Sequence, residues 1–271
     1  MKNEEIVKNY LNALEVDYEI KTLEDITKLI KAHLKTFSFS SLRVLLKEEI
    51  SLELKSIYEN IVLKRRGGYC FEHNKLMYEV LKELGFNVTH YLARIVNNTN
   101  KIPPQTHRFT LLNFKDEKYL IDVGIGFRTP SVPIKFGNKP STSHLGVEYK
   151  IIEFDDKTFA MELTEKGKPF IATKFDLSRC YEADFEIGHF YSYKNPKAVF
   201  VNNFVISLIQ DNMIYSLVNN KYFKIKKEKT EEIEIKNIKQ LEQILKNDLN
   251  SEFTVKEISF FYKSLKLKKV L

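Results

Sequence analysis

Residues 64–74 read KRRGGYCFEHN and place a glycine pair directly before a cysteine. Downstream of this stretch, apolar residues recur with helical spacing as far as Leu84, and Gly85 is placed to end a helix. Cys70 therefore lies in the first turn of a predicted helix, where free backbone N–H groups and the positive end of the helix dipole stabilise a thiolate. The stretch predicts either a nucleophilic cysteine or a small buried thiol that opens a helix.

The composition indicates a folded globular protein with a charged surface. Of the 271 residues 43% are hydrophobic, and 43 basic residues are offset by 36 acidic ones, which leaves a net charge of +7. This balance is typical of a solvated surface, and it also suits an anionic ligand such as a nucleotide-bearing cofactor. Nucleic acid is a weaker alternative, because no binding motif accompanies the charge.

Cysteine usage and hydropathy indicate the cellular compartment of the protein. The two cysteines, Cys70 and Cys180, make no disulfide framework, and no Cys or His spacing fits a zinc site. The first residues lack a hydrophobic signal core, and no apolar run approaches the length of a membrane span. We therefore expect a cytoplasmic protein with a free Cys70 thiol, no metal, and no membrane or nucleic-acid partner.

Hydrophobic periodicity divides the chain into three parts. Helical spacing up to residue 85 predicts a small helical bundle, in which Thr22 and Asp25 form a capping box and residues 37–42 form a connection without regular period. From residue 86, short runs rich in aromatic and β-branched residues predict an antiparallel sheet folded into a barrel. From residue 191, strands mix with two helical patterns. The expected fold class is α+β, with domains at 1–85, 86–190 and 191–271.

A cysteine nucleophile needs an imidazole that takes its proton and a carboxylate that orients the imidazole. His73 shares a helix face with Cys70, but this pair is too local to leave room for a substrate, and His33 fits the helical period of its own segment. His107 opens the first strand of a predicted hairpin, and Asp122 lies near the end of the second. Because Asp122 is flanked by apolar residues, its carboxylate needs a partner.

The register of this hairpin does not by itself bring His107 and Asp122 together. Pairing across a turn centred on residues 116 and 117 places Asp122 opposite position 111, further along the strand than His107. A bulge or a strand bend is needed to close the gap. The residues alone therefore leave two interpretations open, a Cys70–His107–Asp122 unit and three scattered structural residues.

Three segments carry a resemblance to a known family. They are residues 65–74 (RRGGYCFEHN), 106–108 (THR) and 119–126 (YLIDVGIG). In this order and spacing they resemble the bacterial arylamine N-acetyltransferases, from near residue 20 to the end of the barrel. The resemblance implies a helical bundle, a central antiparallel β-barrel and a C-terminal α/β lid, with a papain-like architecture in which bundle and barrel together form the triad.

The resemblance also implies a two-step acetyl transfer without a metal. Cys70 would take the acetyl group from acetyl-CoA as donor substrate, and an arylamine, arylhydrazine or arylhydroxylamine would then accept it. In this reaction His107 would move the proton and Asp122 would orient the imidazole ring. The cleft beside the triad is expected to involve Arg66, Gly67 and Gly68, as scaffold of the loop, and Val123, Gly124, Ile125, Gly126 and Phe127.

The chain departs from the family pattern in three places. Residues 38–42 read SFSSL where the family commonly has PFENL, so Ser38, Ser40 and Ser41 stand in place of a proline, a carboxylate and an amide. That carboxylate and amide usually support the active-site region. Ile125 stands where bacterial members often carry Phe, and Phe127 and Arg128 follow where small residues are common. These changes bear on acceptor and acyl-donor preference.

Two other classes of function stay open. A cysteine hydrolase or a transglutaminase-like enzyme uses the same order of cysteine, histidine and acid without CoA. A weakly active or non-catalytic member would only bind an aromatic or CoA-like ligand. Faster alkylation of Cys70 than of Cys180 by iodoacetamide at neutral pH would separate a catalytic thiol from an inert one.

Overall fold

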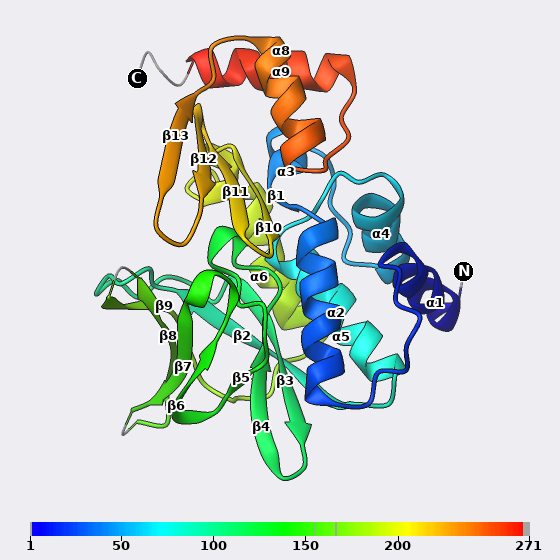
Figure 1. Ribbon diagram of the computed structural model, residues 1–271, viewed down its shortest axis with the longest axis vertical. Helices are drawn as coiled ribbons and strands as arrows, with labels where there is room; N and C mark the ends of the chain where they lie inside the picture. Colours follow the sequence, from blue (N-terminus) through cyan, green and yellow to red (C-terminus); the bar gives the residue numbers. More distant parts are fainter. Residues whose placement is uncertain (1, 155, 166, 268–271) are drawn as a thin grey trace.

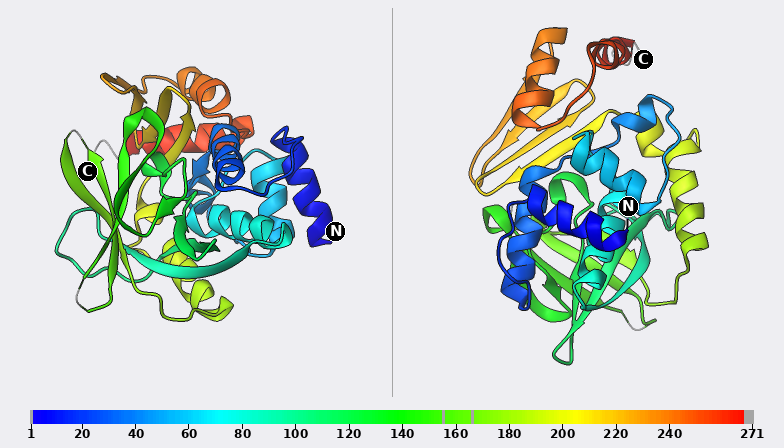
Figure 2. Two further views of the ribbon diagram at one scale, coloured as in Figure 1. Left: turned by 60° about the horizontal axis from the view of Figure 1, so that its bottom comes forward. Right: turned by 90° about the vertical axis from the view of Figure 1, so that its right-hand side faces the viewer.

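The computed structural model describes residues 2–154, 156–165 and 167–267, and Figures 1 and 2 show it as ribbons. The α-helices of this part are α1 (Asn3–Ala13), α2 (Leu23–Thr36), α3 (Leu42–Leu45), α4 (Leu54–Tyr58), α5 (Cys70–Glu83), α6 (Glu182–Lys194), α7 (Val199–Asn202), α8 (Ile238–Gln243) and α9 (Val255–Leu267). Two π-helical turns, η1 (Glu59–Leu63) and η4 (Ile244–Asp248), continue α4 and α8, and two 3₁₀ turns are η2 (Gly126–Arg128) and η3 (His144–Gly146).

The strands form two separate sheets. They are β1 (Phe39–Ser40), β2 (Asn87–Ile95), β3 (His107–Phe114), β4 (Glu117–Ile121), β5 (Ile134–Lys135), β6 (Gly137–Thr142), β7 (Glu148–Glu153), β8 (Phe159–Glu165), β9 (Lys168–Phe175), β10 (Val205–Gln210), β11 (Met213–Val218), β12 (Lys221–Ile225) and β13 (Thr230–Glu234). The eight-stranded sheet has the order β5-β4-β3-β2-β9-β8-β7-β6, and the five-stranded sheet has the order β1-β10-β11-β12-β13.

The N-terminal helices pack together through their apolar stripes. The predicted capping box opens α2, where the Asp25 N–H donates to Thr22 Oγ1 at 3.2 Å and the Thr22 N–H donates to the Asp25 carboxylate at 2.9 Å. Leu29 of α2 and Met77 of α5 are fully buried in the shared core. Burial of one such side chain contributes about 1.5–3 kcal/mol, so packing stabilises these short helices.

The eight-stranded antiparallel sheet curls into a nearly closed barrel, as predicted (Figure 2, left). Its side chains alternate between two environments, because successive residues of a strand face opposite sides. On β4, Leu120 packs inside the barrel, whereas Tyr119 and Ile121 pack against the helices. The helix α5 lies against β2 and β3, which brings the start of α5 next to the barrel.

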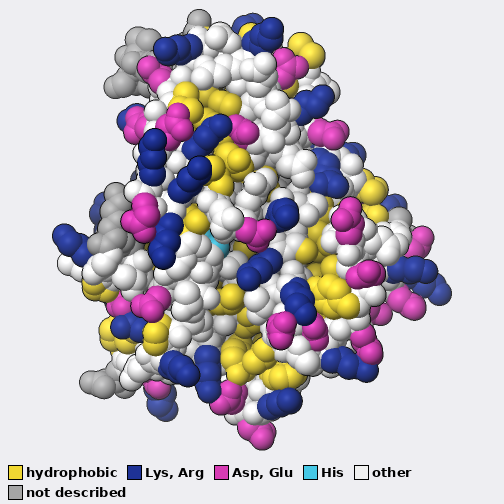
Figure 3. Space-filling model, in the orientation of Figure 1, with side chains coloured by type: hydrophobic (Ala, Val, Ile, Leu, Met, Phe, Trp, Pro, Cys, Tyr) yellow, Lys and Arg dark blue, Asp and Glu magenta, His cyan; other side chains and the backbone are white. Residues whose placement is uncertain are grey.

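The five-stranded sheet joins the two ends of the chain. Residues 37–42, expected to lack regular structure, contain β1, in which Phe39 pairs with Ser207 of β10. The sequence pattern did not indicate this strand, because it is two residues long and has its partner far away in the chain. The helices α8 and α9 cover one face of the sheet, where Leu217 and Phe261 share a core. On the face shown in Figure 3, Lys and Arg side chains gather over β12 and β13.

The β3–β4 hairpin has a tighter turn than predicted. Lys115 and Asp116 both have positive φ, 49° and 62°, and connect the strands as a two-residue turn. Ile121 therefore lies opposite Thr110, two positions from the predicted register. The strand β4 ends at Ile121, so Asp122 lies outside the ladder. Because the chain leaves the sheet after Ile121, it bends at the point where a bend is needed to bring Asp122 to His107.

Candidate active site

The cysteine is placed by a loop that only glycine can form. Gly67 has a φ of +68°, and a Cβ on it would lie 2.4 Å from the carbonyl oxygen of Ser38. The helix α5 then begins at Cys70, and the Tyr69 N–H donates to the Glu72 carboxylate at 3.2 Å. Cys70 is 3% exposed, and its Sγ lies 3.6 Å from the Thr106 carbonyl oxygen.

The structure brings the three predicted catalytic side chains together. His107 Nε2 lies 2.6 Å from Asp122 Oδ2, and both residues are buried. Cys70 lies close enough to His107 to help raise the pKa of its imidazole. Since Nε2 faces the aspartate, Nδ1 is the ring nitrogen left for the sulfur. The residues come from three places in the fold, the start of α5, the start of β3 and the segment after β4.

Asn74 is a fourth member of this constellation, and its role was not predicted from the sequence. Its Nδ2 donates to Asp122 Oδ1 at 2.9 Å and to the Arg108 carbonyl oxygen at 2.6 Å, and its Oδ1 accepts the Val123 N–H at 2.9 Å. Asn74 is fully buried. The signal in the sequence is its spacing, because positions i and i+4 share a helix face and Asn74 lies four residues after Cys70.

The electrostatics of the site favour a charged imidazole. Burial lowers the pKa of His107, but the charge and hydrogen bond of Asp122 and the contact with Cys70 outweigh burial and raise this pKa to about 10. Asp122 is held in turn, since its Oδ1 also accepts the Gly124 N–H at 2.9 Å. An imidazolium beside Cys70 is the partner that a nucleophilic thiolate needs at neutral pH.

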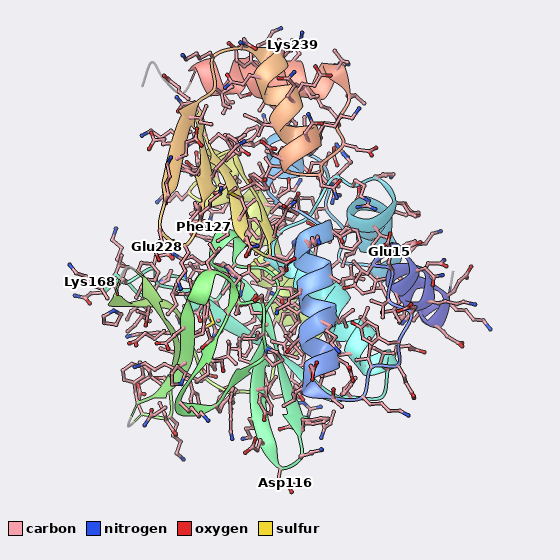
Figure 4. The ribbon with its side chains drawn as sticks, viewed as in Figure 1. Glu15, Asp116, Phe127, Lys168, Glu228 and Lys239 are labelled. Carbon is pink, nitrogen blue, oxygen red and sulfur yellow. The ribbon has the colours of Figure 1, made fainter. Side chains whose placement is uncertain are left out.

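The glycines after Asp122 let the barrel approach the start of α5. A Cβ on Gly124 would lie 2.8 Å from Cys70 Cα, so a larger residue has no room there. Val123 is buried in the helix core, whereas Ile125 is part-exposed. Gly126 has a φ of +66° and begins η2. Figure 4 shows Phe127 where η2 meets the five-stranded sheet.

Arg66 of the predicted cleft and the neighbouring Arg128 both have partners within the protein. Arg66 pairs with two carboxylates, of Glu48 and Glu257, and contributes to the scaffold of the loop. Arg128 lies 4.4 Å from the centre of the Phe127 ring and 4.3 Å from that of Phe170. Gly68 packs on Glu72 and on Ile61, which places it between α5 and η1.

His73 has no free ring nitrogen for Cys70. Its Nε2 lies 3.0 Å from the Ser38 carbonyl oxygen, and its Nδ1 lies 2.8 Å from His33 Nε2. His33 Nδ1 in turn accepts a hydrogen bond from the Tyr10 hydroxyl at 2.9 Å. Burial lowers the pKa of His73 to about 4, so this ring is neutral at physiological pH. The pair His33 and His73 is therefore part of the bundle core.

Residues 2–154, 156–165 and 167–267 hold no group of three or more His, Cys, Asp or Glu side chains placed to bind a metal ion. Within the same ranges no helix has the length and apolar character needed to cross a membrane.

Comparison with known proteins agrees with this geometry. A family model described as N-acetyltransferase matches residues 22–258. The chain is 36% identical to the arylamine N-acetyltransferase of Escherichia coli (strain K12) over 180 residues, which is 65% of this chain and 64% of that protein.

Two solved structures share the fold. The arylamine N-acetyltransferase of Salmonella typhimurium superposes with a TM-score of 0.89 at 25% identity, over 96% of this chain and 98% of that one. The Mycobacterium marinum arylamine N-acetyltransferase in complex with CoA gives a TM-score of 0.86 at 22% identity, over 96% of each chain. The chain belongs to the arylamine N-acetyltransferase family, a family of acyltransferases.

Proposed function

We propose that this protein transfers an acetyl group from acetyl-CoA to an arylamine, arylhydrazine or arylhydroxylamine through an acetyl-Cys70 intermediate. The observation that carries the proposal is the contact of Cys70, His107 and Asp122 at the start of α5. Family membership supports the acyl chemistry. The solved complex of the M. marinum protein with CoA supports the donor.

In the first step the Cys70 thiolate attacks the thioester carbonyl carbon. The carbonyl oxygen becomes an oxyanion, and the Cys70 N–H is a donor for it, because the first N–H groups of a helix have no carbonyl partner within the helix. The C–S bond to CoA then breaks, and the His107 imidazolium protonates the departing thiolate. The products of this step are CoA and acetyl-Cys70.

In the second step the acceptor nitrogen attacks the acetyl carbon of the intermediate. Neutral His107 takes a proton from that nitrogen, and the Cys70–acetyl bond breaks to return the thiolate and imidazolium pair. Asp122 keeps the ring oriented in both steps, since its carboxylate is held by Asn74 and Gly124. We assign the cleft to Ile125, Gly126 and Phe127, which follow the triad in the chain.

The charge distribution suits the donor. CoA carries phosphate groups, and basic side chains gather over β12 and β13 on the face shown in Figure 3. The hairpin between these strands contributes Lys226, Lys227 and Lys229.

The test is to mix the protein with acetyl-CoA alone and measure covalent acetylation by mass spectrometry. One acetyl group should map to Cys70, should be absent in Cys70→Ala, and should be discharged by an arylamine. Cys180 serves as the internal control, because it lies outside the site and burial raises its pKa. Failure to form an adduct or to release CoA would refute the proposal. Hydrolysis of a peptide without CoA would favour a cysteine hydrolase instead.

A further inference from the structure

Arg66 lies in the loop before Cys70, and the structure places two carboxylates against its guanidinium group, those of Glu48 and Glu257. We infer that Glu48 and Glu257 hold this loop, so that the C-terminal helix α9 positions Cys70. This inference rests on the proposed function and assigns Glu48 and Glu257 as positioning residues for the same site.

The contacts of Arg66 are close and leave little freedom. Nη2 lies 2.6 Å from Glu48 Oε1 and 2.5 Å from Glu257 Oε1, and Nη1 lies 3.0 Å from Glu48 Oε2. The guanidinium thus forms a two-pronged pair with Glu48 and a further bond to Glu257. The side chain of Arg66 is 15% exposed, and those of Glu48 and Glu257 are 30% and 22% exposed. Such part-buried pairs are screened less by solvent than surface pairs are.

The ion pairs continue from Glu48 to the residue before the nucleophile. Arg43 Nε lies 3.0 Å from Glu48 Oε2, and Arg43 Nη1 lies 2.6 Å from Glu72 Oε1. The other Glu72 oxygen accepts the Tyr69 N–H. An alternating chain of acids and bases therefore runs from α9 to the N-terminus of α5. Burial raises the pKa of Glu48, but the bonds and charges of Arg66 and Arg43 outweigh this effect and lower it overall.

A second set of contacts ties the same loop to the same C-terminal segment. The Glu252 N–H donates to the Arg65 carbonyl oxygen at 3.0 Å, and the Arg66 guanidinium lies 5.5 Å from the centre of the Phe253 ring. Asn250 Nδ2 donates to the Thr36 carbonyl oxygen at 2.7 Å. Residues 250–257 thus contact both the loop that leads into the glycine pair and the end of α2. In Figure 1 this segment connects the end of η4 with α9 at the top of the molecule.

The position of the loop matters because the proposed oxyanion donor is the Cys70 N–H. When Arg66 loses Glu257, the loop keeps Glu48 but can shift relative to α9, and a small misplacement of reacting groups lowers a rate strongly. Glu257 also closes a capping box at the start of α9, since its carboxylate accepts the Thr254 N–H at 2.7 Å and the Thr254 hydroxyl at 2.8 Å. Thr254→Ala removes the hydroxyl but keeps the Thr254 N–H bond to Glu257 and the contact of Glu257 with Arg66, so it is the matched control for Glu257→Gln.

The experiment uses the full chain and a single turnover with acetyl-CoA. The burst of CoA release counts the reactive Cys70 in each preparation, and the acylation rate is expressed per reactive Cys70, so unfolded molecules do not contribute. We expect Glu257→Gln to lower this rate about tenfold with the KM for acetyl-CoA unchanged, and Thr254→Ala to leave it within about twofold of wild type. Glu48→Gln should lower it further, because Glu48 contacts both arginines.

Two results would overturn the inference. One is a rate per reactive Cys70 in Glu257→Gln equal to that of the wild type, and the other is an equal loss in Thr254→Ala. Alkylation of Cys70 by iodoacetamide gives a readout that needs no acetyl-CoA, and it should also slow in Glu257→Gln. If the wild type takes up no acetyl group but alkylation still slows in this variant, the proposed function fails and the positioning role of Glu257 stands.

Discussion

The replacement of Asn74 by alanine tests whether this residue holds Asp122, the aspartate of the proposed triad. Asn74 is fully buried and makes hydrogen bonds to Asp122, Val123 and Arg108. Without it the Val123 N–H loses its acceptor, at a cost of about 1–3 kcal/mol. Asp122 and the Arg108 carbonyl oxygen each lose a donor, which adds about 1 kcal/mol apiece. The free energy of unfolding should therefore fall by about 3–5 kcal/mol.

The catalytic effect of Asn74→Ala follows from the same contacts. Asp122 keeps the Gly124 N–H and His107 but can rotate, so acylation of Cys70 by acetyl-CoA should slow about 10–100-fold. Urea denaturation and single-turnover CoA release measure the two quantities. Asn60→Ala is the control, since Asn60 is also buried but its side chain makes, among the described residues, one hydrogen bond, to the Ser56 carbonyl oxygen at 2.8 Å. Equal losses of stability and rate in the two variants would refute the reasoning.

Three further predictions concern the charge, the loop and the buried histidines. Asp122→Asn removes the charge that raises the His107 pKa, so the acylation rate should fall about 10³–10⁴-fold while the fold is kept; a fall below tenfold in stopped-flow assays would contradict this. Gly67→Ala forces a Cβ within 2.4 Å of a backbone oxygen and should abolish rapid alkylation of Cys70, whereas Gly85→Ala, at φ +85° with open space around it, should cost only about 1 kcal/mol and leave alkylation unchanged. The free energy of unfolding should be greatest near pH 6.5. Burial lowers the His73 pKa to about 4, so the unfolded chain binds the extra proton and stability falls as the pH drops from 6.5 towards 4. The His107 pKa of about 10 contributes stability that is complete below pH 6.5 and is lost as the pH rises through 10. Urea midpoints measured from pH 4 to 10 check the last prediction, and a urea midpoint that rises as the pH falls from 6.5 to 5 would count against it.

Local features of the sequence determined the helices and placed Cys70 at the start of one of them. The start of α5 at Cys70 follows from the glycine pair and the apolar period after it, and the capping box at Thr22 follows from two side chains three residues apart. Both features involve residues close together in the chain, so both can be predicted from the sequence alone. The resemblance to the family added His107 and Asp122, which the residues alone had left as one of two interpretations. The division at residues 85 and 190 stays a prediction.

Tertiary structure alone decided how distant parts of the chain meet. The tight turn at Lys115 and Asp116 shifted the hairpin register, and the end of β4 before Asp122 turned the carboxylate towards His107. The pairing of β1 with β10, and of Arg66 with Glu257, joins residues far apart in the chain. No periodicity encodes such contacts, because the local pattern specifies which face of an element is apolar but leaves open which other element covers it.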